Sequence, residues 1–142
     1  IEAIWWYDNG TWDQYIPGVT GPGKYFVDGV GYWIKCEKPC TLEISGVIME
    51  NAPFTPPEYP VYPSWNLMGF TSLINMTTAD YLESLTTGYM SPSNQMVIAS
   101  AVGPIWVYDA SKGTWTRNPS QFWPTQGFWM YYKLHEDTYL AP

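Results

Sequence analysis

A tryptophan-rich internal repeat constrains the fold more than any other feature of this sequence. Three pairs of segments match: Ile-Trp-Trp-Tyr-Asp at 4–8 with Ile-Trp-Val-Tyr-Asp at 105–109, Gly-Thr-Trp at 10–12 with 113–115, and Gly-Tyr-Trp-Ile at 31–34 with Gly-Phe-Trp-Met at 127–130. Self-similarity of this kind is typical of duplicated supersecondary units that bury a shared core. Each copy is predicted to form a hairpin followed by a strand, because Asp8-Asn9-Gly10 is a good two-residue turn between aromatic strands.

The composition favours a mainly β fold. The 142 residues include 13 Pro, 12 Gly, 12 Tyr and 9 Trp. Aromatic side chains suit a half-buried pleated surface, and Pro and Gly mark the turns between short strands. We therefore expect two pseudo-repeated β lobes, sandwich-like or barrel-like, with one short helix. A chain of this length can bury about 68% of its unfolded surface, so it needs no metal to fold.

The material between the copies occurs only once. Residues 51–63 contain five Pro and are expected to form an extended connector. Ser64–Phe70 is predicted to be a strand, and residues 77–85 the helix, with Thr77 as its N-cap. Three parts are therefore predicted: 1–46 as the second half of a first repeat, 47–63 as a Pro-rich connector, and 64–142 as a complete second repeat.

The charge balance excludes several partners. With 13 acidic and 6 basic side chains, the net charge of −7 opposes binding to nucleic acid or anionic lipid. No apolar run reaches the ~18 residues of a membrane span, and Ile1–Ile4 lacks the basic head and apolar stretch of a signal peptide. We expect a mature or excised segment that has no nucleic-acid partner and no membrane span.

Two cysteines and two sequons favour an extracellular setting. Cys36 and Cys40 flank Glu-Lys-Pro, a spacing that can close a small disulfide loop, and an extracellular composition permits one. A structural zinc site is disfavoured because His135 is the only histidine and no further cysteine lies beside it. Asn9 and Asn75 begin Asn-x-Thr triplets and are candidate N-glycosylation sites.

The order of motifs in the second part matches a known pattern. Trp-Asn-Leu at 65–67, the predicted helix, Trp-Val-Tyr-Asp at 106–109 and Gly-Phe-Trp-Met at 127–130 follow one another. This order resembles a β-rich repeat of secreted and cell-surface proteins of bacteria and archaea, which ends in a Thr-Leu strand. Thr41–Gly46 matches that closing strand, whereas Thr138–Leu140 is a weak version and the cysteine pair is outside the pattern. The resemblance implies a non-catalytic surface module and assigns no active-site residues.

The tryptophans divide into recurring and unmatched ones. We predict a structural role for those that recur in both copies: Trp5, Trp12, Trp33, Trp106, Trp115 and Trp129. Trp6 is replaced by Val107 in the other copy, and Trp123 follows Phe122 in a predicted loop, so these two are candidate partner contacts. In a glycan-binding interpretation, Trp123 stacks on a sugar ring while Gln121 and Gln126 bind its hydroxyls.

Self-association is predicted from an apolar strand. Ile4, Trp5, Trp6 and Tyr7 form a candidate edge strand, and an unpaired apolar edge is a template for strand addition from another chain. Repeated head to tail, such a contact builds a filament. The expected partners are further copies of the chain or other cell-surface proteins.

Catalysis is disfavoured. General acid–base catalysis needs titratable groups within mutual reach, and the sequence offers one His and scattered carboxylates. Asp8 and Asp109 are explained as turn residues, so we assign no catalytic, cofactor-binding or metal-ligating residues. The sequence favours an extracellular, non-enzymatic structural or adhesive surface protein that associates with itself. The alternative is a carbohydrate-binding module that uses exposed Trp and Tyr.

Overall fold

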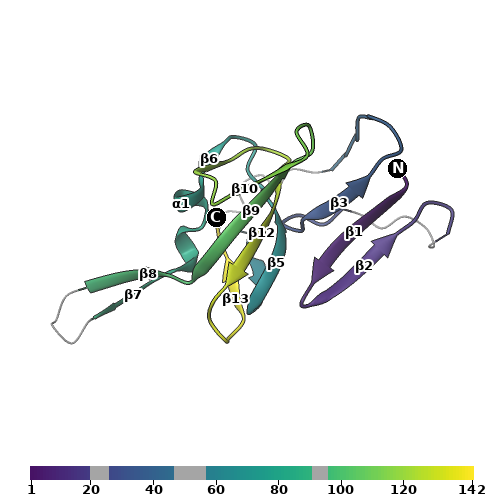
Figure 1. The fold of residues 1–142 in the computed structure, drawn as a ribbon. Coiled ribbons are helices and arrows are strands. Elements are labelled where there is room, and N and C mark those ends of the chain that lie inside the picture. Colours follow the sequence, from purple (N-terminus) through teal and green to yellow (C-terminus); the bar gives the residue numbers. More distant parts are fainter. Residues whose placement is uncertain (20–25, 47–56, 91–95) are drawn as a thin grey trace.

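Two antiparallel sheets hold the duplicated segments (Figure 1). The computed structural model describes residues 1–19, 26–46, 57–90 and 96–142, with the backbone alone for 87–90 and 96–99. The first sheet has the order β2-β1-β3, with β1 at Ala3–Asp8, β2 at Thr11–Tyr15 and β3 at Tyr32–Lys35. The second has the order β10-β9-β12-β5, with β9 at Val102–Asp109, β10 at Thr114–Arg117, β12 at Gly127–Tyr132 and β5 at Ser64–Gly69.

The remaining elements are short and follow the second repeat. Three two-stranded pairs are β4 (Tyr59–Val61) with β13 (Thr138–Leu140), β6 (Met76–Thr77) with β11 (Gln121–Phe122), and β7 (Thr86–Met90) with β8 (Met96–Ser100). The helix α1 (Thr78–Tyr81) is followed by a single 3₁₀ turn, η1 (Glu83–Leu85). The predicted mainly β fold with one short helix is confirmed. Since β2 and β10 have no outer partner within the described ranges, the sheets are open and sandwich-like rather than a closed barrel.

The helix begins where the sequence predicts. The Thr77 side chain accepts a hydrogen bond from the backbone N–H of Asp80 at 3.1 Å, which satisfies one of the donors that a helix start leaves open. The regular helix ends at Tyr81, and the chain continues through Leu82 into η1. The predicted nine-residue helix is therefore split into two tighter pieces.

The two repeats pair in the same register, which confirms the duplication at the level of the backbone. In the first sheet Tyr7 lies opposite Trp12, and in the second Tyr108 lies opposite Trp115. The pairs on the other side correspond equally: Ile4 with Ile34, Trp5 with Trp33 and Trp6 with Tyr32 in the first sheet, and Ile105 with Met130, Trp106 with Trp129 and Val107 with Phe128 in the second. Each unit is thus a hairpin followed by a third strand, as predicted.

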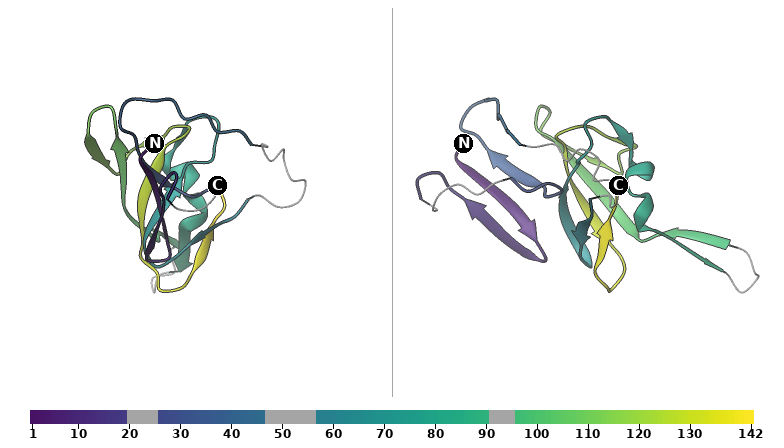
Figure 2. Two further views of the ribbon diagram at one scale, coloured as in Figure 1. Left: turned by 90° about the vertical axis from the view of Figure 1, so that its right-hand side faces the viewer. Right: turned by 180° about the vertical axis from the view of Figure 1, so that it is seen from behind.

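One strand borders both sheets. β5 pairs along its whole length with β12, and its other edge contacts the residues that lead into β3. Gly31 N–H donates to Leu67 O at 3.2 Å, and Gly69 N–H donates to Gly29 O at 2.9 Å. The first repeat has no opening strand of its own in the described residues, so β5 serves both halves. In Figures 1 and 2, β5 is the edge strand of the second sheet on the side that faces the first sheet.

The hydrophobic core belongs to the second repeat. Ile105, Val107, Phe128 and Met130 lie on one face of the second sheet, and all four are buried. Against them pack the ring of Phe122, stacked on Phe128 at 4.4 Å, and residues from α1, β4 and β13: Tyr81, Val61 and Leu140. In the first sheet, by contrast, Ala3 and Ile4 are the only buried hydrophobic residues.

Asn66 explains the Trp-Asn-Leu motif. It is buried, and its side chain closes the tight connection between β4 and β5. Its Oδ1 accepts from Tyr62 N–H at 2.9 Å, and its Nδ2 donates to Tyr62 O at 2.8 Å and Ser64 O at 3.2 Å. A buried amide is stable only when its polar atoms have partners, and here the chain turn itself supplies them.

Two expectations from the sequence need correction or addition. Ile4–Tyr7 is not an edge, because β1 is the central strand of the first sheet, with β2 and β3 on its two sides. Of the predicted Pro-rich connector, residues 47–56 lie outside the described residues. Its last part does more than connect, since Tyr59–Val61 forms β4 and buries Val61 fully in the core.

We predict that Gly69→Ala destabilises the fold by about 1–3 kcal/mol, the usual cost of overpacking. A Cβ at Gly69 would stand 2.7 Å from Val30 O, where β5 meets the first repeat. Gly127, directly opposite in the register, is the matched control, because a Cβ there meets only Met68 O at 3.7 Å. Urea unfolding measures both variants, and equal losses of stability would contradict the close approach.

Candidate binding surface: aromatic clefts between the sheets

The duplicated register places the recurring aromatics on one face of each sheet. Residues opposite one another in antiparallel strands point to the same side. The first sheet therefore presents an indole face made of Trp5, Tyr7, Trp12 and Trp33. The second sheet presents the corresponding indole face, made of Trp106, Tyr108, Trp115 and Trp129.

The two indole faces pack against each other through reciprocal contacts. The ring of Trp33 lies 5.2 Å from that of Tyr108 and 5.5 Å from that of Trp115. Its counterpart Trp129 lies 5.2 Å from Tyr7 and 5.6 Å from Trp12. In a twofold interface, each contact between a residue of one half and a residue of the other occurs a second time between the equivalent residues with the halves exchanged. The two repeats therefore associate inside one chain as a pseudo-symmetric dimer.

Two open clefts flank this interface. One, of about 560 Å³, is lined by Tyr7, Trp12, Trp65, Trp106, Trp115 and Trp129. The other, of about 890 Å³, is lined by Trp5, Trp12, Asp13, Gln14, Trp33, Trp115 and Trp129. The pseudo-twofold exchanges Trp5 with Trp106, Trp12 with Trp115 and Trp33 with Trp129, so it relates part of one lining to part of the other. Trp12, Trp115 and Trp129 line both clefts, whereas Trp33 lines only the larger one.

Some polar atoms of the larger cleft form hydrogen bonds within the chain. In the larger cleft Trp5 Nε1 donates to Gln14 Oε1 at 3.2 Å, and Asp13 Oδ1 accepts from Gln14 N–H at 2.9 Å. In the second sheet, the position of Gln14 is taken by Arg117, whose guanidinium lies over Trp106, 5.8 Å from the ring centre. The smaller cleft has no charged residue in its lining. These surfaces suit a neutral, apolar partner.

The recurring tryptophans pack as predicted and also remain accessible. Trp12 is 50% exposed and Trp115 is 46% exposed, although both rings contact aromatic neighbours in the opposite repeat. Two such large half-exposed rings at one site form an apolar surface of the kind that marks binding sites. The recurrence of these tryptophans is the sequence feature that marks the clefts, but by itself it predicts only a structural role in packing.

The predicted glycan contacts lie at a separate turn. Trp123 is 55% exposed and is followed by Thr125 with φ 67°. Gln126 closes this turn, because its Oε1 accepts from Trp123 N–H at 3.2 Å and its own N–H donates to Trp123 O at 3.1 Å. Gln121 pairs with Thr77 between β11 and β6. None of these residues lines the two aromatic clefts.

Trp6 lies on the other face of the first sheet. Its ring centre is 6.1 Å from that of Tyr32, and both residues line a third cleft of about 760 Å³. In that cleft the Tyr59 hydroxyl donates to Asp28 Oδ2 at 2.6 Å, and burial together with Asp28 raises the pKa of Tyr59. The hydroxyl therefore stays a neutral donor. The structure does not bring Trp6 and Trp123 into a common site among the described clefts.

Cys36 and Cys40 are free thiols, so the predicted disulfide is not formed in this structure. Their sulfur atoms lie 3.0 Å apart, with the Cys40 thiol donating to Cys36. The neighbouring Cys40 sulfur, together with loss of solvation, raises the pKa of the Cys36 thiol, because a thiolate at Cys36 would lie beside a second ionisable sulfur. The chain bends at Glu37 and Lys38. The close approach of the two cysteines is therefore confirmed, while the covalent bond is not.

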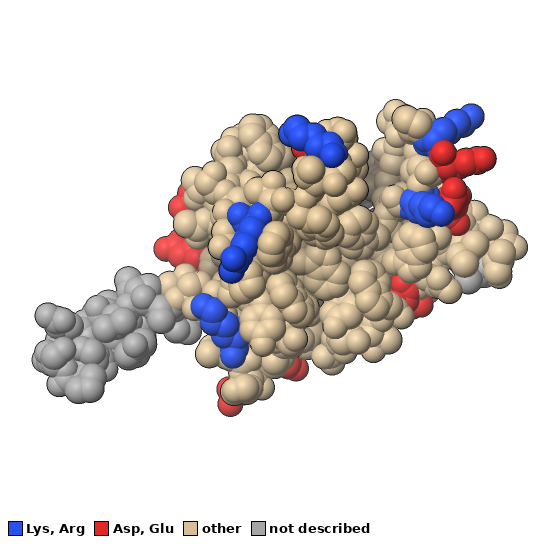
Figure 3. All heavy atoms as spheres, viewed as in Figure 1, with Lys and Arg blue, Asp and Glu red and all other residues tan. Residues whose placement is uncertain are grey.

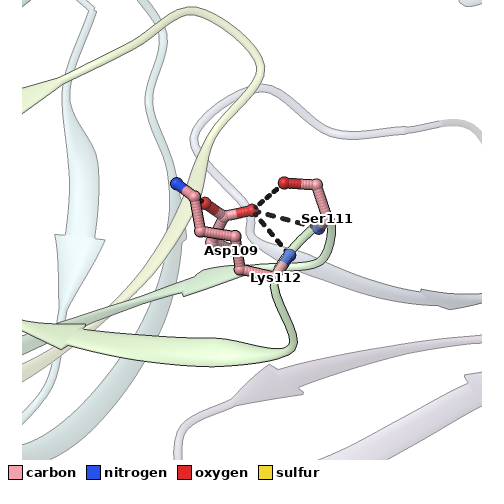
Figure 4. Close-up of polar contacts among 3 residues, drawn as sticks. All are labelled: Asp109, Ser111 and Lys112. Carbon is pink, nitrogen blue, oxygen red and sulfur yellow. Dashed lines mark hydrogen bonds and ion pairs between the residues drawn. The ribbon is translucent and has the colours of Figure 1, made fainter.

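The turn at Asp109 shows why Asp recurs at this place. Asp109 Oδ1 accepts from the Ser111 N–H at 3.0 Å and from its hydroxyl at 2.6 Å, and Lys112 Nζ lies 2.7 Å from Oδ2 (Figure 4). The Lys112 ammonium and Ser111 lower the pKa of Asp109 to about 2. The carboxylate thus organises its own turn, which agrees with a structural role.

No known protein family, curated protein or solved structure matches this chain. In residues 1–19, 26–46, 57–90 and 96–142, His, Cys, Asp and Glu side chains form no group of three or more that could hold a metal ion. Neither α1 nor any other helix in that part of the chain is long and apolar enough to cross a membrane.

We predict that the two reciprocal aromatic contacts contribute equally to stability. Double-mutant cycles with leucine substitutions at Tyr7 and Trp129, and at Trp33 and Tyr108, should each give a coupling free energy of about 0.5–1.5 kcal/mol. The pair Trp123 and Trp129 is the control, with a coupling near zero. A coupling in one cycle only, measured by urea unfolding, would contradict the pseudo-twofold packing.

Proposed function

We propose that this chain is a non-catalytic structural or adhesive element of an extracellular surface that associates with further copies of itself. One observation carries the proposal: the β7–β8 hairpin extends away from the rest of the molecule (Figures 1 and 2). Within the described residues, β7 and β8 pair with each other and with no other strand. We call this hairpin, residues 86–90 and 96–100, the arm.

The arm is a poor free-standing structure. A two-stranded hairpin is marginally stable in water unless its side chains pack against something else. The sequences of β7 and β8, Thr-Thr-Gly-Tyr-Met and Met-Val-Ile-Ala-Ser, are rich in apolar residues. A second copy of the chain would supply the apolar surface that the arm lacks.

The arm also lacks the features that keep exposed strands apart. Proteins usually protect exposed strands with charges or Pro. Here β2 carries Asp13 and β10 carries Arg117 at the outer edges of the two sheets. β7 and β8 carry neither a charge nor a Pro. In a chain with net charge −7, an uncharged arm is where two copies meet with least repulsion.

An extracellular setting is supported by the sequons and by the surface. Asn9 lies in the β1–β2 turn and Asn75 just before β6, and both are exposed, so each is accessible for glycosylation. Figure 3 shows a broad uncharged area across the middle of one face, with acidic and basic side chains scattered around it. The resemblance to cell-surface repeats points in the same direction.

The carbohydrate-binding alternative has less support. Trp123 offers an exposed ring, but Gln126 uses its side-chain oxygen to hold the turn rather than presenting it outward. In the larger aromatic cleft, Gln14 Oε1 and Asp13 Oδ1 likewise accept hydrogen bonds from within the chain. A sugar site needs such groups for the ligand hydroxyls. Self-association requires only the apolar surfaces.

We predict that the arm controls assembly. Tyr89 and Val97 are cross-strand partners, and changing both to Thr keeps the preference for strand structure while removing apolar surface. The native chain should form larger species as its concentration rises, seen by sedimentation velocity and negative-stain imaging. The double variant should weaken association at least ~10-fold, since each lost apolar side chain is worth about 1–2 kcal/mol.

The matched control replaces two exposed apolar residues outside the arm, Leu73→Thr with Ile74→Thr, which are 72% and 70% exposed. If general stickiness drove association, this control would weaken it as well. The proposal predicts native behaviour for the control. A native chain that stays monomeric at every concentration would overturn the proposal.

A further inference from the structure

We infer that the arm of one copy docks into the aromatic clefts between the sheets of a second copy. This inference rests on the proposed self-association and names the surface that receives the arm. The acceptor is the pair of clefts that share Trp12 and Trp115. The occupant is the uncharged, apolar β7–β8 hairpin of another chain.

The polarity of the two surfaces matches. The smaller cleft is lined by aromatic residues alone, and the larger adds only Asp13 and Gln14, of which Asp13 Oδ1 and Gln14 Oε1 accept hydrogen bonds within the chain. An apolar strand docked in the smaller cleft covers no charged side chain, and burying an unpaired charge is the largest penalty of a badly chosen partner. The sequences of β7 and β8 bring Tyr, Met, Val and Ile and no charge.

The rings at the cleft mouths are the kind that anchor interfaces. Trp and Tyr dominate the residues whose removal weakens protein–protein complexes, because they offer large rigid surfaces at low entropic cost. Trp12 and Trp115 stand half-exposed at the boundary of both clefts. Packing in the free chain already fixes their neighbours Trp129 and Trp33, so the acceptor is largely preformed.

The placement of the two surfaces determines the form of the assembly. The arm projects beyond the second sheet, at the end of the molecule opposite the first sheet (Figures 1 and 2). The clefts lie between the two sheets. An arm-to-cleft contact therefore joins two different surfaces, and a contact of this head-to-tail kind repeats into an open filament unless its rotation closes a ring.

The test uses complementary full-length variants. The arm variant combines Tyr89→Thr and Val97→Thr, and the cleft variant is Trp12→Thr, with Trp115→Thr as a second version at the pseudo-equivalent position. Trp123→Thr is the matched control, since Trp123 is 55% exposed and lies outside the clefts. Near-UV circular dichroism checks that each variant keeps its tertiary structure, and sedimentation velocity measures assembly.

We expect the arm variant and the cleft variant each to remain monomeric, with association at least ~10-fold weaker than for the native chain. Mixed together they should form a dimer and nothing larger, because one intact arm meets one intact cleft. The Trp123 variant should assemble like the native chain. If the cleft variants assemble normally while the arm variant does not, the acceptor is elsewhere and only the proposed function stands. If all the variants assemble normally, the chain associates through neither the arm nor the clefts, and this inference fails together with the predicted role of the arm. If the native chain itself stays monomeric, the proposed function fails as well.

Discussion

The contact between the two indole faces holds this structure together. The first sheet has almost no core of its own, because Ala3 and Ile4 are its only buried hydrophobic residues, whereas the second repeat buries a continuous cluster of rings. The first sheet is held in place by the packing of Trp33 and Trp129, each against the opposite repeat. Two backbone hydrogen bonds with β5 add to this, one donated by Gly31 and one accepted by Gly29. Aromatic pairs worth about 0.5–1.5 kcal/mol each are significant against the small net stability of a domain.

The pseudo-twofold interface also explains why the proposed assembly would use a different surface. A reciprocal contact satisfies both partners at once, so the internal pairing of the two repeats leaves no matching surface for a third. What it leaves open are the flanking clefts, where Trp12 and Trp115 are only half covered. The β7–β8 hairpin, which has no counterpart among the described residues of the first repeat, projects from the body. In the proposed assembly, the duplicated segments form the acceptor and the unique hairpin is the donor.

The repeat predicted the local structure well because the matching motifs place the same residue types opposite one another in both copies, although the two turns differ in length. Tyr7 opposite Trp12, the turn at Asn9, and the Thr77 cap all follow from short-range rules. The order of the strands within each sheet could not be predicted from such short-range rules. The consecutive apolar and aromatic residues of Ile4–Tyr7 indicate a strand but not its neighbours, and β1 becomes central because Tyr32–Lys35 pairs with its second edge. The half-exposure of Trp12 could not be predicted either, because a recurring aromatic residue gives the same sequence pattern whether it is buried or lines a cleft.

The central claim is that the two repeats pair face to face through their tryptophans. Proton NMR on the monomeric arm variant tests it most directly, through nuclear Overhauser contacts between assigned indole rings. The account predicts cross-peaks between Trp33 and Trp115 and, with similar intensity, between Trp12 and Trp129. Cross-peaks confined to neighbours within each sheet, such as Trp65 with Tyr131, would contradict it.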